Sequence, residues 1–162
     1  MSDEEAPAGE LNPWILSSYF IYSGILLLKL FLNLFLIAIA RSRTKIMSNP
    51  EDLNLVPKEK RKDYKVGVSH SFLTRVLRMQ RNDLENIIPF FILGYMYAMT
   101  WYTPYWRARL HYRIFVGARL LHSFCHFFAI QPLRTLFYII AMSANVSLAI
   151  HILYKVGRLN YI

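Results

Sequence analysis

Four long apolar stretches dominate the pattern of hydrophobic and polar positions along this chain. They cover residues 14–40, 86–106, 114–133 and 135–154. Only two charged residues interrupt them, Lys29 in the first stretch and Arg119 in the third. Because a helix of about 20 apolar residues is long enough to cross a bilayer, each stretch predicts one membrane-spanning helix. We therefore expect an all-α membrane protein with four transmembrane helices and a polar loop over residues 41–82.

Three prolines predict where these helices begin and end. Pro89 is expected near the start of the second helix, where its missing N–H costs little. Pro104 is expected to mark the end of that helix, and Pro132 the very short link between the third and fourth helices. Short links place consecutive helices antiparallel, so the pattern predicts an up-down bundle in a single domain over residues 1–162.

The composition supports a membrane protein and excludes several other classes. Of the 162 residues, 55% are hydrophobic and only 18% are charged, with a mean hydropathy of +0.27. Such a composition excludes intrinsic disorder, and a small soluble domain would have difficulty burying so much apolar surface. The single cysteine, Cys125, excludes a disulfide scaffold and is expected to be a buried small hydrophobe. The net charge of +9 does not predict nucleic-acid binding, because the arginines are scattered among apolar segments.

The distribution of charge predicts an orientation in the membrane. Residues 41–82 hold eleven of the 19 Lys and Arg residues, so the positive-inside rule places this loop in the cytosol. Its basic run at 58–62 is expected to form a solvated or lipid-headgroup face. The acidic N-terminus then lies in the lumen. Three basic residues run against the rule, although the long loop should dominate: Arg107, Lys155 and Arg158.

A charged segment leads directly into the second apolar stretch. Arg75, Arg78, Asn82 and Glu85 recur at steps of 3, 4 and 3, which places them on one face of a helix. Arg81 and Glu85 are spaced to form an i, i+4 pair. Polar groups that enter a membrane cost several kcal/mol unless they face the bundle and find partners there.

Two interpretations of these charges remain open. They can form an internal salt-bridge network, or they can surround a bound anion. Four arginines could converge at the cytosolic end, with Asp83 and Glu85 as the only nearby acids: Arg78, Arg81, Arg119 and Arg134. The excess positive charge favours an anion, and a ligand with carboxylates and an amine would fit this inventory.

Two further groups of polar residues have alternative interpretations. His122 and His126 have the i, i+4 spacing of a metal pair, but no third ligand is evident, so we expect no metal site and instead hydrogen-bonded structure or a pocket wall. At the start of the fourth stretch, Arg134 and Thr135, with Tyr138 one turn on, could stabilise a thiolate or an oxyanion. Alternatively, Thr135 is an ordinary helix N-terminal residue and Arg134 extends to the headgroups.

Three motifs resemble one known family. They are Arg-Asn-Asp-Leu-Glu-Asn-Ile-Ile-Pro-Phe at 81–90, Asn-Pro-Glu-Asp at 49–52 and Phe-Val-Gly-Ala-Arg-Leu-Leu-His at 115–122. Over about residues 14–156 the chain resembles the membrane-associated proteins in eicosanoid and glutathione metabolism, the MAPEG family. The resemblance implies a homotrimer in the endoplasmic reticulum membrane, with glutathione between subunits near the cytosolic face. The glutathione-binding set that it implies comprises Arg41, Arg78, Arg81, Asn82, Asp83, Glu85, His122, His126, Arg134, Thr135 and Tyr138.

The resemblance also implies an enzyme and leaves two activities open. One branch of the family isomerises prostaglandin H2 to prostaglandin E2, and another conjugates glutathione to hydrophobic electrophiles or reduces lipid peroxides. Arg134 and Thr135 resemble the Arg-Ser pair of the synthase branch, and Asp52 matches an aspartate implicated in its activity, so these three are the expected catalytic residues. The chain departs from the family at Gln80, usually His, and His126, usually Tyr. The alternative function is a non-enzymatic lipid-presenting scaffold, which should lack a complete glutathione site.

Overall fold

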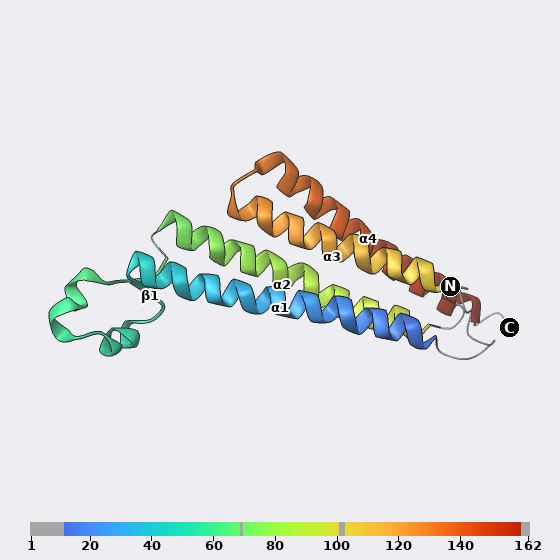
Figure 1. The fold of residues 1–162 in the computed structure, drawn as a ribbon, viewed down its shortest axis with the longest axis horizontal. Helices are drawn as coiled ribbons and strands as arrows, with labels where there is room; N and C mark the ends of the chain where they lie inside the picture. Colours follow the sequence, from blue (N-terminus) through green and yellow to red (C-terminus); the bar gives the residue numbers. More distant parts are fainter. Residues whose placement is uncertain (1–11, 69, 101–102, 160–162) are drawn as a thin grey trace.

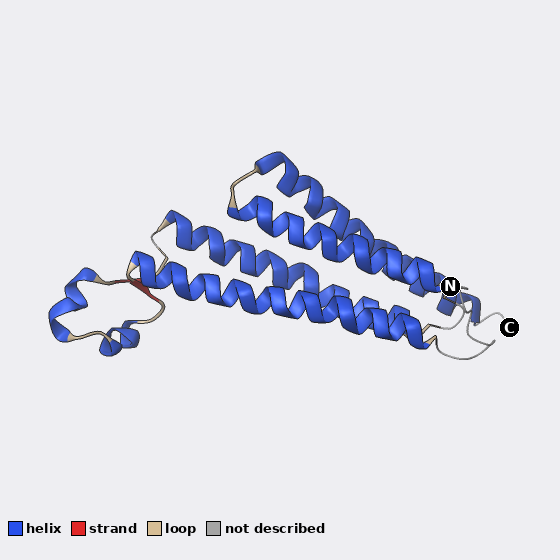
Figure 2. Cartoon of the chain, in the orientation of Figure 1, coloured by secondary structure: helices blue, strands red, loops and turns tan. Residues whose placement is uncertain are grey.

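Long helices make up most of the chain. The computed structural model describes residues 12–68, 70–100 and 103–159. Within this part, four long helices lie side by side along one axis, and consecutive helices run in opposite directions (Figure 1). Colouring by secondary structure shows how little else there is (Figure 2), which confirms the all-α prediction. In chain order the elements are α1 (Pro13–Thr44), β1 (Ile46–Met47), the 3-10 helices η1 (Pro50–Leu55) and η2 (Lys58–Asp63), β2 (Lys65–Val66), α2 (Ser71–Ala98), α3 (Tyr105–Phe127) and α4 (Gln131–Leu159).

The helix ends follow from local capping. The Oδ1 atom of Asn12 accepts a hydrogen bond from the Trp14 backbone N–H at 3.0 Å and starts α1. Lys45, in the left-handed conformation with φ 53°, ends that helix. His70 starts α2, because its Nδ1 accepts from the Phe72 N–H at 3.2 Å. The polar loop is closed at its base where Ile46–Met47 pairs in parallel with Lys65–Val66.

The helix boundaries differ from the limits of the apolar stretches at both ends of α2, α3 and α4. α2 begins at Ser71, well before residue 86, so it includes the charged segment and extends far out of the apolar stretch. Pro89 therefore lies inside α2 and not near its start, which corrects the prediction for this residue. α3 ends at Phe127, earlier than the apolar stretch, because the chain turns at Ala129 with φ 61°. Pro132 lies in the first turn of α4 and not in the link between the helices, which corrects the prediction for this residue. α2 ends at Ala98, and Pro104 is the N-cap of α3, so this proline marks the start of the third helix and not, as predicted, the end of the second.

Aromatic side chains fill the core where the helices meet. The rings of Phe90 and Phe115 stack at a centroid distance of 4.2 Å, which joins α2 to α3. Tyr112 donates a hydrogen bond to the Gly94 carbonyl at 2.8 Å. A Cβ atom at Gly94 would lie only 3.1 Å from the ring of Tyr19, so a larger residue would crowd this contact. This glycine allows α1, α2 and α3 to approach closely in the core. Cys125 is buried, as predicted.

Two helices have the length and composition needed to cross a membrane. They are Pro13–Thr44 and Gln131–Arg158. On α1 the outward residues Leu28 and Phe35 are 69% and 68% exposed, as expected of side chains that face lipid. α2 and α3 carry more charged residues, and neither is apolar enough over its described length to qualify as a membrane span by composition. The structure is thus consistent with a membrane protein whose two central helices hold polar groups inside.

A buried ion cluster, defined as Lys29, Asp83 and Arg119, joins the first three helices. Lys29 Nζ contacts Asp83 Oδ2, and Arg119 Nη2 contacts Asp83 Oδ1. Asn33 adds a hydrogen bond to Asp83 Oδ2 at 2.6 Å, and the Ser123 hydroxyl lies 3.2 Å from the same oxygen. The carboxylate is fully buried, as is the Arg119 guanidinium. Because one carboxylate faces two cations, this cluster holds α1, α2 and α3 in a fixed register.

Candidate functional site

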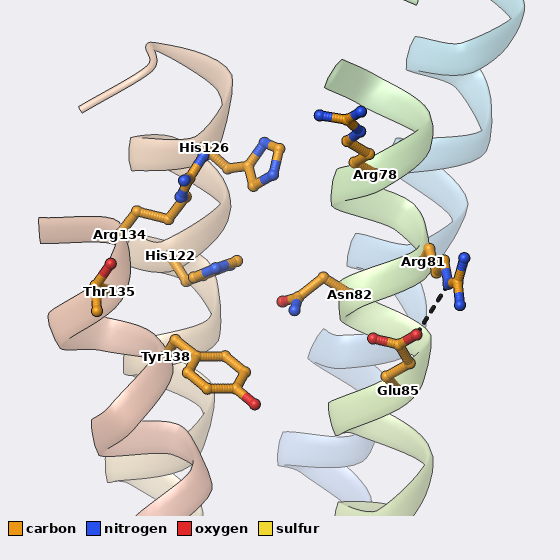
Figure 3. Close-up of a pocket in the computed structure, with 9 residues that line it drawn as sticks. All are labelled: Arg78, Arg81, Asn82, Glu85, His122, His126, Arg134, Thr135 and Tyr138. Atoms are coloured by element: carbon orange, nitrogen blue, oxygen red, sulfur yellow. Dashed lines mark hydrogen bonds and ion pairs between the residues drawn. The ribbon is translucent and has the colours of Figure 1, made fainter. Parts of the chain in front are cut away.

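A cavity of about 440 Å³ opens between α2 on one side and α3 and α4 on the other (Figure 3). A volume of this size suits a small ligand. Apart from Glu85, which is near the middle of α2, its lining residues on α2 and α4 lie in the first half of each helix. Both helices begin at the same end of the molecule (Figure 1). The described residues that line it are Arg78, Arg81, Asn82, Glu85, His122, His126, Arg134, Thr135 and Tyr138. All nine belong to the set that the sequence predicted.

The α2 wall of the cavity carries one acid among several bases. Arg78, Asn82 and Glu85 recur at helical spacing, so their side chains share the face that Figure 3 shows turned towards α3 and α4. Arg81 Nε donates to Glu85 Oε1 at 3.0 Å, which confirms the predicted i, i+4 pair. Both side chains remain open to the outside, at 83% and 55% exposure. Their pairing is therefore weak enough for a ligand to replace.

Asn82 is held in place from behind the cavity wall. Arg119 Nη2 donates to Asn82 Oδ1 at 2.9 Å and contacts Asp83 as well. Asn86 Nδ2 donates to the Asn82 backbone carbonyl at 2.8 Å. Because Arg119 already donates to the side-chain oxygen of Asn82, its amide nitrogen is a hydrogen-bond donor available beside the cavity. The buried ion cluster thus fixes one hydrogen-bond donor of the site.

The opposite wall combines two histidines with a tyrosine. The rings of His122 and His126 lie 5.8 Å apart, and the ring of Tyr138 lies 6.4 Å from that of His122. Both histidines are buried, and their Nδ1 atoms have no hydrogen-bond partner among the described residues. Within those same residues, no group of three or more His, Cys, Asp or Glu is placed to hold a metal ion. The two histidines are therefore a polar wall with unused hydrogen-bonding capacity.

The first turns of α4 bring a guanidinium and a hydroxyl to the cavity. Arg134 Nη2 contacts Gln131 Oε1, which keeps its guanidinium beside the helix start. The Thr135 hydroxyl lies 3.5 Å from the Gln131 carbonyl, at the outer limit of a hydrogen bond. Thr135 is exposed and lies one turn into α4, because that helix begins at Gln131. Its hydroxyl can therefore turn towards a ligand at little cost.

Two residues of the predicted glutathione-binding set, and the predicted catalytic residue Asp52, lie outside this cavity wall. Asp83 faces the opposite side of α2 from Glu85 and belongs to the buried ion cluster. Arg41 donates to the Ile46 carbonyl at 3.4 Å near the end of α1. Asp52 caps η1, where its Oδ2 accepts from the Asn49 N–H at 3.0 Å. The polar loop that carries Asp52 extends beyond the end of α1 (Figure 1), so a single chain does not bring it to the cavity.

The charged residues fall into two groups, one corresponding to each interpretation. Arg119 and Asp83 form the internal network, together with Lys29. Three other arginines, with Glu85 as the one acid among the described lining residues, form the cavity wall: Arg78, Arg81 and Arg134. This inventory suits a ligand with carboxylates and an amine. The sequence reasoning missed the role of Lys29; its signal was a lone charge in a 27-residue apolar run, with Asn33 one turn further on.

Comparison with known proteins identifies the relatives of this chain. The model of the MAPEG family matches residues 19–154. Bovine (Bos taurus) prostaglandin E synthase is 28% identical over 149 residues, which cover 91% of this chain and 94% of that protein. Human (Homo sapiens) microsomal glutathione S-transferase 1 is 36% identical over 134 residues, covering 82% and 84%. Human prostaglandin E synthase is 30% identical over 146 residues, covering 88% and 91%. The chain therefore belongs to the MAPEG family.

Proposed function

We propose that this protein is a membrane enzyme that binds glutathione and uses its thiol. The observation that supports this most strongly is the charge inventory of the cavity, in which three arginines and one glutamate surround a volume of about 440 Å³. Glutathione carries two carboxylates, one ammonium group and one thiol. Its carboxylates would pair with the arginines, and its ammonium group with Glu85. Relatives named as a glutathione transferase support the same ligand.

In this proposal Arg134 and Thr135 activate the thiol. The guanidinium of Arg134 and the hydroxyl of Thr135 would both favour the charged form of the sulfur and so lower the pKa of the glutathione thiol. Asn82 would donate its amide N–H to the peptide, because Arg119 already occupies its oxygen. The thiolate is the nucleophile that the reaction needs, since the thiol itself reacts poorly.

The bound thiolate supports two reactions. In conjugation, a bond forms between the sulfur and the electrophilic carbon of a hydrophobic compound, the bond from that carbon to its leaving group breaks, and glutathione is consumed. In isomerisation of prostaglandin H2, the sulfur bonds to one peroxide oxygen, the O–O bond breaks, and the other oxygen takes up a proton to become a hydroxyl. The carbon that bears the sulfur-bound oxygen then loses its proton, the ketone forms, and the S–O bond breaks, so the thiolate is regenerated. The relatives include proteins named for each activity. In both reactions the lipid substrate would enter laterally from the bilayer.

We further propose a homotrimer with four transmembrane helices per subunit in the endoplasmic reticulum membrane, with the cavity on the cytosolic side. The exposure of Arg81 and Glu85 supports a site that a neighbouring subunit closes. Arg41 and Asp52, which lie at the same end of the molecule, would reach glutathione only from that neighbour. Mass analysis corrected for bound detergent tests this assembly. A monomer that retains full glutathione binding would contradict it.

One pair of assays tests the proposed function. Purified protein is given glutathione with a generic aromatic electrophile, or glutathione with prostaglandin H2, and the glutathione remaining is measured against product formed. One glutathione lost per product indicates conjugation, and product without loss indicates isomerisation. A protein that turns over neither substrate would favour the lipid-presenting scaffold. The presence of a complete cationic cavity with Glu85 argues against that alternative.

Glu85→Gln is expected to weaken glutathione binding more than it weakens binding of the des-amino analogue. The physical reason is that only glutathione carries the ammonium group that Glu85 would pair with, and a hydrogen bond to a charged group contributes about 1.5–3 kcal/mol. The measurement is the Kd of each ligand by titration calorimetry. Glu59→Gln, in the exposed loop, is the matched control and should change neither. Equal losses for both ligands would contradict the pairing.

Thr135→Val keeps the β-branched shape and removes only the hydroxyl. It is expected to raise the pKa of the thiol of bound glutathione by about one to two, because the thiolate loses one hydrogen bond. Thr135→Ser should titrate like the parent. The readout is the ultraviolet absorbance of the bound thiolate against pH, recorded alongside turnover. If the valine variant titrates and turns over like the parent, Thr135 is an ordinary helix residue and Arg134 activates the thiol alone.

A further inference from the structure

A second cavity, of about 590 Å³, adjoins the first at the end of the helices. Three described residues line both cavities: Arg78, His126 and Arg134. The second cavity then continues outwards to His70 and Ser71, which begin α2 and are exposed. A molecule that comes from the water beyond the helix ends can therefore reach the first cavity by way of the second.

The second cavity is more cationic than the first. It has Arg75 in place of Arg81 and lacks Glu85, so none of the described residues that line it is acidic. Arg75 is positioned by a hydrogen bond from its Nη1 to the Phe127 carbonyl at 3.4 Å, and it is absent from the lining of the first cavity. The N-termini of α2 and α4, each a helix of more than 25 residues, add partial positive charge at the same place.

His126 marks the junction between the two cavities. It is 9% exposed, its Nδ1 has no hydrogen-bond partner among the described residues, and it lines both volumes. Figure 3 shows its ring between the side chains of Arg78 and Arg134. A buried polar atom left without a partner indicates a position that a ligand or its water contacts.

We propose that the second cavity is an anion-attracting vestibule through which glutathione reaches its pocket, and that Arg75 speeds this entry without contacting the bound peptide. The proposal rests on the proposed function. Glutathione carries a net negative charge at neutral pH, and a concave surface of one sign raises the association rate of an oppositely charged ligand by about 10- to 1,000-fold in total. Arg75 is one of several positive charges in the vestibule, so it contributes only a part of this increase in association rate.

The test is the association rate constant of glutathione, measured by stopped-flow absorbance of the thiolate with the full-length protein in neutral detergent. Arg75→Gln is expected to lower this constant about threefold to tenfold at low salt and to leave the dissociation rate constant unchanged. The difference should disappear near 1 M salt, where the screening length falls to about 3 Å. Arg75→Lys keeps the charge without the guanidinium and should associate like the parent.

A second variant separates charge from structure. Ser71→Asp places an acid in the vestibule at the first residue of α2, where the helix tolerates it, and should slow association at low salt. Ser71→Asn is its uncharged match. Arg158→Gln removes one charge near the far end of α4 and should change nothing.

Each outcome decides a separate question. A parent that binds no glutathione at any salt concentration overturns the proposed function. A parent that binds while Arg75→Gln and Ser71→Asp associate at the parent rate overturns the vestibule alone. An equal slowing by Arg158→Gln also overturns it, because the effect would then come from net charge.

Discussion

Replacing Asp83 by asparagine is expected to lower the free energy of unfolding by about 3–5 kcal/mol, the cost of leaving buried charges without their partner. Lys29 and Arg119 both contact this carboxylate and both are buried, so the variant would hold two uncompensated cations between α1, α2 and α3. The measurement is the midpoint of unfolding in mixed micelles of increasing denaturing detergent. A midpoint equal to that of the parent would contradict the structural role of the cluster.

Two controls make this result specific. Glu85→Gln removes the exposed partner of Arg81, four residues further along α2. It should lower the free energy of unfolding by less than about 1 kcal/mol. Adding Lys29→Met to Asp83→Asn should recover part of the lost stability, because only one buried cation then lacks a partner. If the double variant is less stable than Asp83→Asn, packing of the Lys29 stem outweighs charge at this position.

Arg134→Gln is expected to reduce turnover by about 100-fold or more. The proposal places this guanidinium beside the sulfur, and removal of one group that stabilises a developing or bound anion costs about 10²–10³ in rate. The pKa of the bound glutathione thiol should rise at the same time, because a nearby cation favours the thiolate. Turnover at saturating glutathione and the thiolate absorbance against pH check the two effects separately.

Arg134→Lys tests whether charge alone suffices. A lysine keeps the positive charge but loses the planar fork, so it should retain the lowered pKa of the thiol and lose part of the rate. Arg158→Gln, at the opposite end of α4, should leave both unchanged. If Arg134→Gln weakens glutathione binding but leaves the rate at saturation intact, Arg134 only binds a carboxylate.

The cavity wall could be predicted from the sequence because its residues repeat at helical spacing and match family motifs. Arg78, Asn82 and Glu85 share a face for the same geometric reason in any helix. Asp83, one residue from Asn82, points about 100° away around the helix and meets Lys29 instead. The motif alone does not separate these neighbours. Only the packing of α1 against α2 does.

The helix limits were harder to predict than the cavity. Hydropathy locates the apolar part of a helix, and the charged segment of α2 continues the helix beyond it, so Ser71 and the interior position of Pro89 were missed. The turn at Ala129 lies within an apolar stretch and leaves no hydropathy signal. Arg41 and Asp52 lie at the end of α1 and in η1, outside the cavity of a single chain, so their predicted role depends on the homotrimer that we propose.

The most direct test of the central claim is the ultraviolet spectrum of glutathione bound to the purified protein at neutral pH. The cationic cavity with Thr135 predicts a saturable thiolate absorbance, reached at a pH where free glutathione is almost entirely the thiol. The absorbance should saturate at one glutathione per cavity. It should fall sharply in Arg134→Gln. Glutathione that binds without any thiolate absorbance, or that does not bind at all, would contradict the account.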